Sequence, residues 1–163
     1  MTPKQHATAL LKFSRTVGLD MLKGFPEDKY TWQSCPTDNH VLWVLGHLAS
    51  TDAWLAGAVG APGAGVPETW QAIFGMGSRP VNDPKKYPSI AEVKKALDQN
   101  RAAVLNWLEG AHDKDLAQSL TEKTGGFASD PIDGLLKLSW HDGWHFGQVA
   151  SLRKALGLPA VMG

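Results

Sequence analysis

The chain has 163 residues, which suits a single domain over residues 1–163 that can bury roughly two-thirds of its unfolded surface. Its 16 Lys and Arg residues balance 16 Asp and Glu residues, and zero net charge argues against a nucleic-acid binder held by phosphate contacts and against a polybasic membrane anchor. The single cysteine, Cys35, excludes an internal disulfide, and without a signal-peptide pattern or a membrane-length apolar run we expect a cytoplasmic protein.

The first predicted helix spans about residues 3–21. Leu10, Phe13 and Val17 recur at helical spacing and form an apolar stripe that we expect to face the core. Gly24 and Pro26 end this helix, because neither residue favours its continuation.

The second predicted helix spans about residues 37–59, after Pro36. Thr37, Asp38 or Asn39 can cap its first turn with a side-chain oxygen. Its inward positions are spaced by three or four residues. They are His40, Val44, His47, Thr51, Leu55 and Ala58.

Residues 60–88 form a Gly- and Pro-rich connection, with a short helix expected around residues 68–74. A link of this length without a strand is unusual, so it should cover something or cross the molecule. The third helix begins after Ser89, which forms a capping box with Glu92, and continues to about Ala111. A short helical turn is expected within residues 113–120. The inward positions of the third helix are Val93, Leu97, Asn100, Val104, Trp107 and Ala111.

The fourth predicted helix has the clearest limits. Asp130 is a good N-cap, Pro131 suits the first helical position, and Gly157 is the expected terminator. Its inward positions are Leu135, Leu138, His141, His145, Val149, Leu152 and Leu156. No segment alternates like a strand. The sequence therefore predicts an all-α four-helix bundle with a long crossover between the second and third helices, whose short first and third links favour antiparallel neighbours.

Three histidines occupy inward positions and predict a metal site. His141 and His145 are four residues apart, so they share one face of the fourth helix, and His47 is inward on the second. Buried imidazoles in apolar stripes are costly without partners, and a shared cation removes that cost. We expect one divalent transition metal, zinc or nickel first, with coordination positions left open. The alternative is three histidines satisfied by hydrogen bonds within the core.

Four further residues are candidates for supporting a ligand or lining the pocket. Gln148 lies three residues after His145, so it can reach a ligand, whereas Asn100 suits either a satisfied core amide or the metal pocket. His40 is inward near the start of its helix. Asp142 follows His141 as the acid follows the first histidine in the zincin motif H-E-x-x-H, but no third ligand follows downstream, so a solvated or partner-facing Asp142 is equally consistent.

Two tryptophans on one edge of the fourth helix, Trp140 and Trp144, most simply pack in the core or in a dimer.

Two segments resemble the DinB-like (DinB/YfiT) family of metal-dependent four-helix bundles. They are Trp43-Val-Leu-Gly-His47-Leu and His141-Asp-Gly-Trp-His145-Phe-Gly-Gln148, the second of which is similar to the family's H-x-x-x-H-x-G-Q motif. The resemblance implies His47, His141 and His145 as the three metal ligands, and a homodimer. It also implies thiol chemistry, since characterised relatives include S-transferases that use a low-molecular-weight thiol and a thiol-dependent maleylpyruvate isomerase.

These observations leave three functional hypotheses. The first is a thiol-dependent S-transferase that acts on small molecules, with a low-molecular-weight thiol as cosubstrate activated at the three-histidine metal site. The second is a metal-dependent hydrolase in which Asp142 or His40 assists a water molecule. The third is a non-enzymatic, stress-related protein that binds a metal.

Overall fold

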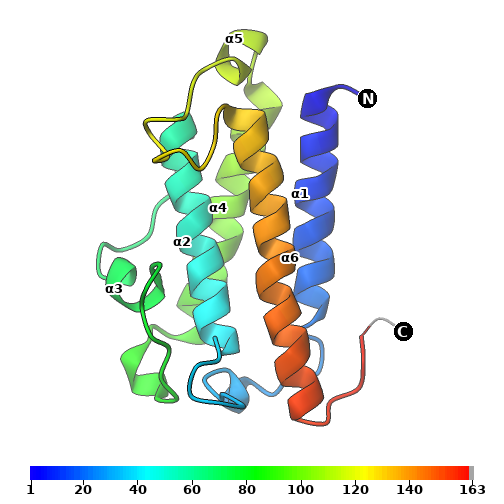
Figure 1. The fold of residues 1–163 in the computed structure, drawn as a ribbon, viewed down its shortest axis with the longest axis vertical. Coiled ribbons are helices and arrows are strands. Elements are labelled where there is room, and N and C mark those ends of the chain that lie inside the picture. Colours follow the sequence, from blue (N-terminus) through cyan, green and yellow to red (C-terminus); the bar gives the residue numbers. More distant parts are fainter. Residues whose placement is uncertain (162–163) are drawn as a thin grey trace.

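The computed structural model describes residues 1–161 and is all-helical, as predicted, with no strand in that part of the chain. Four long helices make up the body of the molecule (Figure 1): α1 (Pro3–Asp20), α2 (Val41–Val59), α4 (Ile90–Gly110) and α6 (Pro131–Ala155). Four short helical segments lie in the connections. They are η1 (Glu27–Lys29), α3 (Trp70–Phe74), η2 (Pro84–Lys86) and α5 (Asp113–Leu116).

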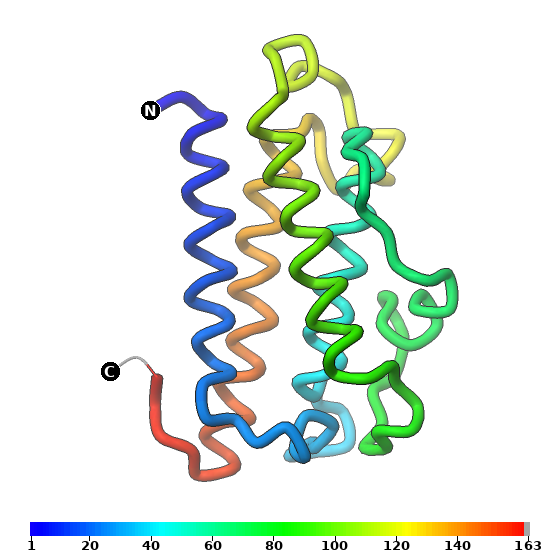
Figure 2. The backbone as a smooth tube through the Cα atoms, turned by 180° about the vertical axis from the view of Figure 1, so that it is seen from behind, coloured from blue at the N-terminus to red at the C-terminus, as the bar shows by residue number. Residues whose placement is uncertain are grey.

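The crossover between α2 and α4 makes these two helices run in the same direction, and α1 and α6 run in the opposite one (Figures 1 and 2). Helix α1 packs mainly on α6, α4 packs mainly on α2, and α2 also packs on α6. The two pairs joined by the first and third links, α1 with α2 and α4 with α6, are therefore antiparallel, as expected, but each pair lies diagonally across the bundle rather than side by side. The first link can span this diagonal because it passes under the end of the bundle (Figure 2).

Helix starts follow the capping signals except in α2. Ser89 and Glu92 form the predicted capping box, and the Asp130 side chain accepts a hydrogen bond from the Asp133 amide. Helix α2 begins at Val41 rather than near residue 37, because the His40 ring caps it: Nδ1 accepts a hydrogen bond of 3.0 Å from the Trp43 amide.

The predicted inward stripe of α1 is wrong. Leu10 and Phe13 are exposed, whereas Ala7, Leu11 and Gly18 are buried with Arg15. The physical reason is that the inward side of α1 makes a buried ion pair through Arg15, and that Gly18 lets the ring of Phe146 on α6 approach its backbone. The exposed apolar side of α1 faces α6 across a groove of about 410 Å³.

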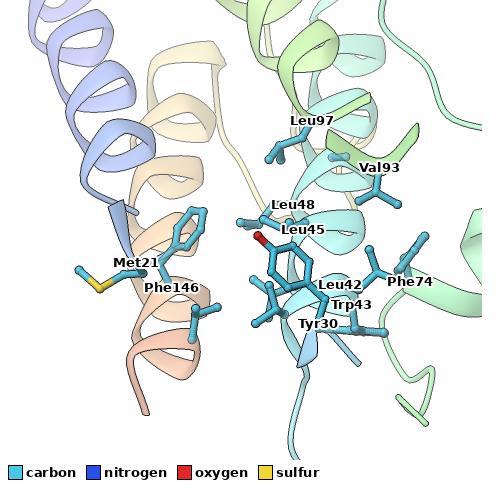
Figure 3. Packing of buried hydrophobic residues seen from close by; sticks show 14 of the residues in the cluster. Met21, Tyr30, Leu42, Trp43, Leu45, Leu48, Phe74, Val93, Leu97 and Phe146 are labelled. Atoms are coloured by element: carbon cyan, nitrogen blue, oxygen red, sulfur yellow. The ribbon is translucent and has the colours of Figure 1, made fainter. Parts of the chain in front are cut away.

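The core surrounds α2, which is buried on nearly every side. Figure 3 shows the core cluster at the end of the bundle where α2 begins, with Trp43 of α2 and Phe74 of α3 at its edge. A second cluster fills the other end between α1, α2, α4 and α6. None of the helices within residues 1–161 is both long and apolar enough to cross a membrane.

Candidate metal centre

The rings of His47, His141 and His145 meet between α2 and α6. The Nε2 atom of His141 lies 3.2 Å from Nε2 of His47 and 3.1 Å from Nε2 of His145. One nitrogen from each ring lies within 4.8 Å of the other two. Helical spacing brings His141 and His145 together on one turn of α6, and the packing of α2 on α6 adds His47. The three residues predicted as ligands are thus neighbours in space.

The Nδ1 atoms of two of the rings lie within hydrogen-bond distance of oxygen acceptors. His47 Nδ1 lies 2.7 Å from the backbone carbonyl oxygen of Phe74, and His145 Nδ1 lies 3.1 Å from Oε1 of Gln148. Because a carbonyl oxygen only accepts hydrogen bonds, each Nδ1 carries the proton and donates it. The Nε2 atoms of His47 and His145 therefore direct their lone pairs toward the same point as His141.

This donor set fits one divalent metal ion. Tetrahedral zinc, with Zn–N bonds of about 2.0–2.1 Å, separates its nitrogen ligands by about 3.3 Å, close to the two Nε2 separations in this site. The Nε2 lone pairs of His47 and His145 are both directed at Nε2 of His141, which can donate a hydrogen bond to only one of them. The Nδ1 atom of His141 is also buried without a partner. A cation at the centre would satisfy all three Nε2 atoms at once.

Burial keeps the three imidazoles neutral at pH 7, the form that binds metals. Desolvation first, and repulsion between neighbouring imidazolium rings second, lower the pKa of His141 to about 4 and that of His145 to about 3. Desolvation also lowers the pKa of His47, against the hydrogen bond to the Phe74 carbonyl.

A cavity of about 360 Å³ opens onto the three rings. One wall is Trp43, whose indole stacks on His47 at 4.6 Å between ring centroids and donates from Nε1 to Ser78 Oγ at 2.8 Å. Trp140 and Trp144 line the same cavity. Both are exposed, so of the two predicted alternatives packing in the core is wrong, and packing in a dimer stays a prediction.

A second, polar cavity of about 260 Å³ adjoins the first. Asn39 lines both cavities, and its Nδ2 donates to Gln148 Oε1 at 3.1 Å, the same oxygen that accepts from His145. Hydroxyl groups of Ser34 and Ser151 line the polar side. The Asn39–Gln148 pair therefore lies between the polar cavity and the histidine cluster.

Asp142 is neither solvated nor partner-facing, which corrects that interpretation. It is buried in a network to which each long helix contributes one charge: Arg15, Asp52, Arg101 and Asp142. Asp142 accepts hydrogen bonds from Arg15 at 2.9 Å and from Ser14 at 3.0 Å, and its ion pair with Arg101 measures 3.1 Å. The comparison with the zincin acid fails, because the Asp142 carboxylate is held by these partners and does not line the histidine cavity.

The other two candidates lie outside both cavities. His40 is fully buried as the cap of α2, in edge contact with the Tyr87 ring. Asn100 is a satisfied core amide: its Nδ2 donates to the Ala49 carbonyl at 3.0 Å and its Oδ1 accepts from the Gly65 amide at 2.8 Å. Asn100 thus ties the crossover to α2 and α4.

The sequence analysis did not predict the charged network, although the spacing of its residues in the sequence indicates it. Arg15 is in phase with Leu11 and Gly18, and Arg101 is in phase with Leu97. A single charge at the inward position of each of four helices, with a sum of zero, predicts a buried network. The role of the Phe74 carbonyl has no such signal, because every residue carries a backbone carbonyl.

Comparisons with known proteins identify one family. The family model described as the DinB superfamily matches residues 10–149, which is more than half of the chain and includes all three histidines. This match confirms the resemblance drawn from the two motifs. Searches of curated proteins and of solved structures found no match.

Proposed function

The chain belongs to the DinB superfamily, and on that premise we propose that it is a metal-dependent S-transferase that joins a small thiol to an electrophilic small molecule. His47, His141 and His145 would hold one divalent ion, zinc or nickel. The observation that carries the proposal is the convergence of three Nε2 atoms at one end of an open cavity. Three protein ligands and an accessible fourth position are typical of catalytic sites, whereas structural zinc sites are closed by four.

The two adjoining cavities support a reaction with two substrates. The cavity over the histidines suits the electrophile, and the polar cavity beyond Asn39 and Gln148 suits the polar end of the thiol. When bound, the ion would lower the pKa of a thiol and supply a thiolate at neutral pH. In the transfer, sulfur forms a bond to the electrophilic carbon, the leaving group departs with its bonding electrons, and the thiol proton passes to solvent.

The residues of the chain orient the reaction rather than exchange its protons. The Phe74 carbonyl and Gln148 Oε1 hold the Nδ1 protons of His47 and His145, which fixes both rings with Nε2 toward the cavity. Trp43 covers the face of His47 and keeps water from that side. No dedicated base is needed for a thiol of lowered pKa.

Two alternatives have less support. Hydrolysis assisted by Asp142 or His40 lacks its base, since Asp142 is engaged by two arginines and His40 caps α2 away from the cavity. A non-enzymatic, stress-related protein that only binds a metal does not need the cavity that leads to the three histidines.

The test is a transfer assay on the zinc- or nickel-loaded protein. We expect 1-chloro-2,4-dinitrobenzene to be consumed with 2-mercaptoethanol or cysteine at a rate that depends on both thiol and metal, and to lose that rate in His145→Ala. The control is His6→Ala, at an exposed histidine of α1. Hydrolysis of 4-nitrophenyl acetate by the loaded protein without thiol, together with no thiol-dependent transfer, would overturn the proposal in favour of a hydrolase.

A further inference from the structure

We propose that the cavity over the histidine cluster, which is lined by Trp43, Met76, Trp140 and Trp144, binds a planar, apolar group of an uncharged substrate. This inference rests on the proposed function, because it names the substrate class of the same site. Its evidence is the placement of large apolar side chains around the cavity and the absence of charge among them.

Three large apolar side chains at this cavity are exposed to solvent rather than packed in the core of the bundle. The exposed fractions are 92% for Met76, 57% for Trp140 and 58% for Trp144. All three line the cavity that ends on His47, His141 and His145. Grouped exposed apolar surface at a hollow is typical of a binding site, since an apolar ligand gains free energy by removing it from water.

One aromatic side chain of the lining is held in place. Trp43 is buried, stacks on His47, and satisfies its indole N–H with Ser78 Oγ, so it presents a rigid aromatic surface. Trp140 and Trp144 contact each other at 5.2 Å between ring centroids, with planes tilted by 58°. Aromatic side chains lining one cavity favour a flat, aromatic ligand over an aliphatic one of equal size.

The lining of the cavity favours an uncharged ligand over a charged one. Among the described residues that line this cavity, none is Lys, Arg, Asp or Glu; its polar groups are the three histidines, Asn39 and Ser78. A charged group beside the tryptophans would lose its hydration without a charged side chain to pair with, and the attraction of a cation to an indole face offsets only part of that loss. The part of the substrate that lies away from the histidines is therefore uncharged.

The experiment compares two fluorescent probes that share an aromatic body but differ in charge. N-phenyl-1-naphthylamine is uncharged, and 8-anilino-1-naphthalenesulfonate is an anion; both brighten in apolar surroundings. Titrations use the zinc-loaded full chain. We expect the neutral probe to bind at least about tenfold more tightly, which corresponds to about 1.4 kcal/mol.

Variants then locate the bound probe. Trp144→Ala and Met76→Ala should each raise the dissociation constant of the neutral probe by about tenfold, and Trp144→Phe should retain most of the affinity because it keeps an aromatic ring. Trp54→Ala removes another exposed tryptophan of α2, and Phe13→Ala alters the separate groove between α1 and α6. Both controls should bind the probe as the wild type does.

Several outcomes would overturn the inference: equal affinity for the two probes, unchanged affinity in Trp144→Ala, or loss of binding in Phe13→Ala, which would place the probe in the groove. Zinc content, measured in the same samples, separates this inference from the proposed function. A Trp144→Ala protein that retains zinc but binds the probe normally contradicts only the substrate class. A wild-type protein that takes up no zinc contradicts the proposed function itself.

Discussion

The hydrogen-bond partner of Nδ1 in each imidazole determines whether its Nε2 atom is free to bind a metal. In His47 and His145 an oxygen acceptor holds the Nδ1 proton, so Nε2 is free to bind a cation. The two acceptors differ in kind, because one belongs to the backbone of α3 and the other to the side chain of Gln148. Only the second can be removed by a point mutation without changing the main chain.

Gln148→Ala should therefore weaken metal binding while leaving the three ligands in place. We expect a loss of about 10- to 100-fold in zinc affinity, the range typical when a residue that orients a metal-bound histidine is removed. Competition with a chromophoric chelator measures it. Gln118→Ala, at a glutamine near the opposite end of the bundle, is the matched control. Equal zinc affinity in Gln148→Ala and wild type would show that Gln148 does not orient His145.

His40 gives the fold a pH dependence of its own. Burial lowers its pKa from 6.5 to about 4 in the folded chain. Above pH 6.5 both states are neutral and the full stability is present; as the pH falls toward 4, the unfolded chain takes up a proton that the folded chain does not, so the free energy of unfolding falls. Protonation would also remove the Nδ1 acceptor of the Trp43 amide.

His40→Asn should keep the cap of α2 but remove this titration, since Asn is a strong N-cap. Urea denaturation of the metal-free protein at several pH values between 7 and 4.5 tests it. The stability of the variant should fall less steeply, by up to about 1.4 kcal/mol per pH unit. The three clustered histidines titrate in both proteins, so the difference between the two curves isolates His40. If the curves of stability against pH for the wild type and His40→Asn run parallel, His40 does not have the titration described for it.

Helix α2 connects the core to the metal centre through a close contact with α3. A Cβ atom at Gly46 would overlap the ring of Phe74, which is fully buried, and the carbonyl of Phe74 holds His47. The glycine therefore sets the distance between α2 and α3. Packing at this contact and orientation of the ligand are linked.

Gly46→Ala should lower stability and zinc affinity together. Overpacking costs about 1–3 kcal/mol, and displacement of Phe74 moves the acceptor of His47 Nδ1. Gly57→Ala lies on the same helix with no atom within 4 Å of its new Cβ, so it should leave zinc affinity unchanged and raise stability by up to about 1 kcal/mol. Chemical denaturation and the chelator assay check both variants. Normal zinc affinity in Gly46→Ala would separate the packing contact from the site.

At the scale of the whole molecule, the network of Arg15, Asp52, Arg101 and Asp142 joins all four long helices. Its charges cancel, and both aspartates are shared between the two arginines. The guanidinium groups of Arg15 and Arg101 hold the pKa of Asp52 below its usual value despite complete burial. Asp142 adjoins His141 in the chain, so the network also anchors the turn of α6 that carries two of the three clustered histidines.

Asp52→Ala should destabilise the bundle by about 3–5 kcal/mol, because it leaves two buried guanidinium groups with one carboxylate. Denaturation with guanidinium chloride measures the loss in the free energy of unfolding. The control is Lys23→Ala, which breaks a surface ion pair with Asp20 and should change stability by less than about 1 kcal/mol. A loss in Asp52→Ala no larger than that of the control would mean that the network does not hold the helices together.

The long helices, the caps of α4 and α6 and the crossover follow from the sequence, because hydrophobic periodicity and capping residues act locally. The start of α2 and the orientation of α1 do not, since they depend on the His40 cap and on the buried partner of Arg15 across the bundle. The three histidines could be placed on inward faces from spacing alone. Their second partners could not, apart from Gln148, because Phe74 reaches His47 through tertiary packing. The homodimer implied by the family resemblance stays a prediction.

The central claim is that His47, His141 and His145 together bind one metal ion, and elemental mass spectrometry of protein purified without a metal-affinity tag tests it directly. We expect about one equivalent of zinc or nickel in the wild type and in His6→Ala, and almost none in His145→Ala. A wild type that carries no transition metal and takes up none from added zinc or nickel would contradict the account, as would a His145→Ala protein with undiminished metal.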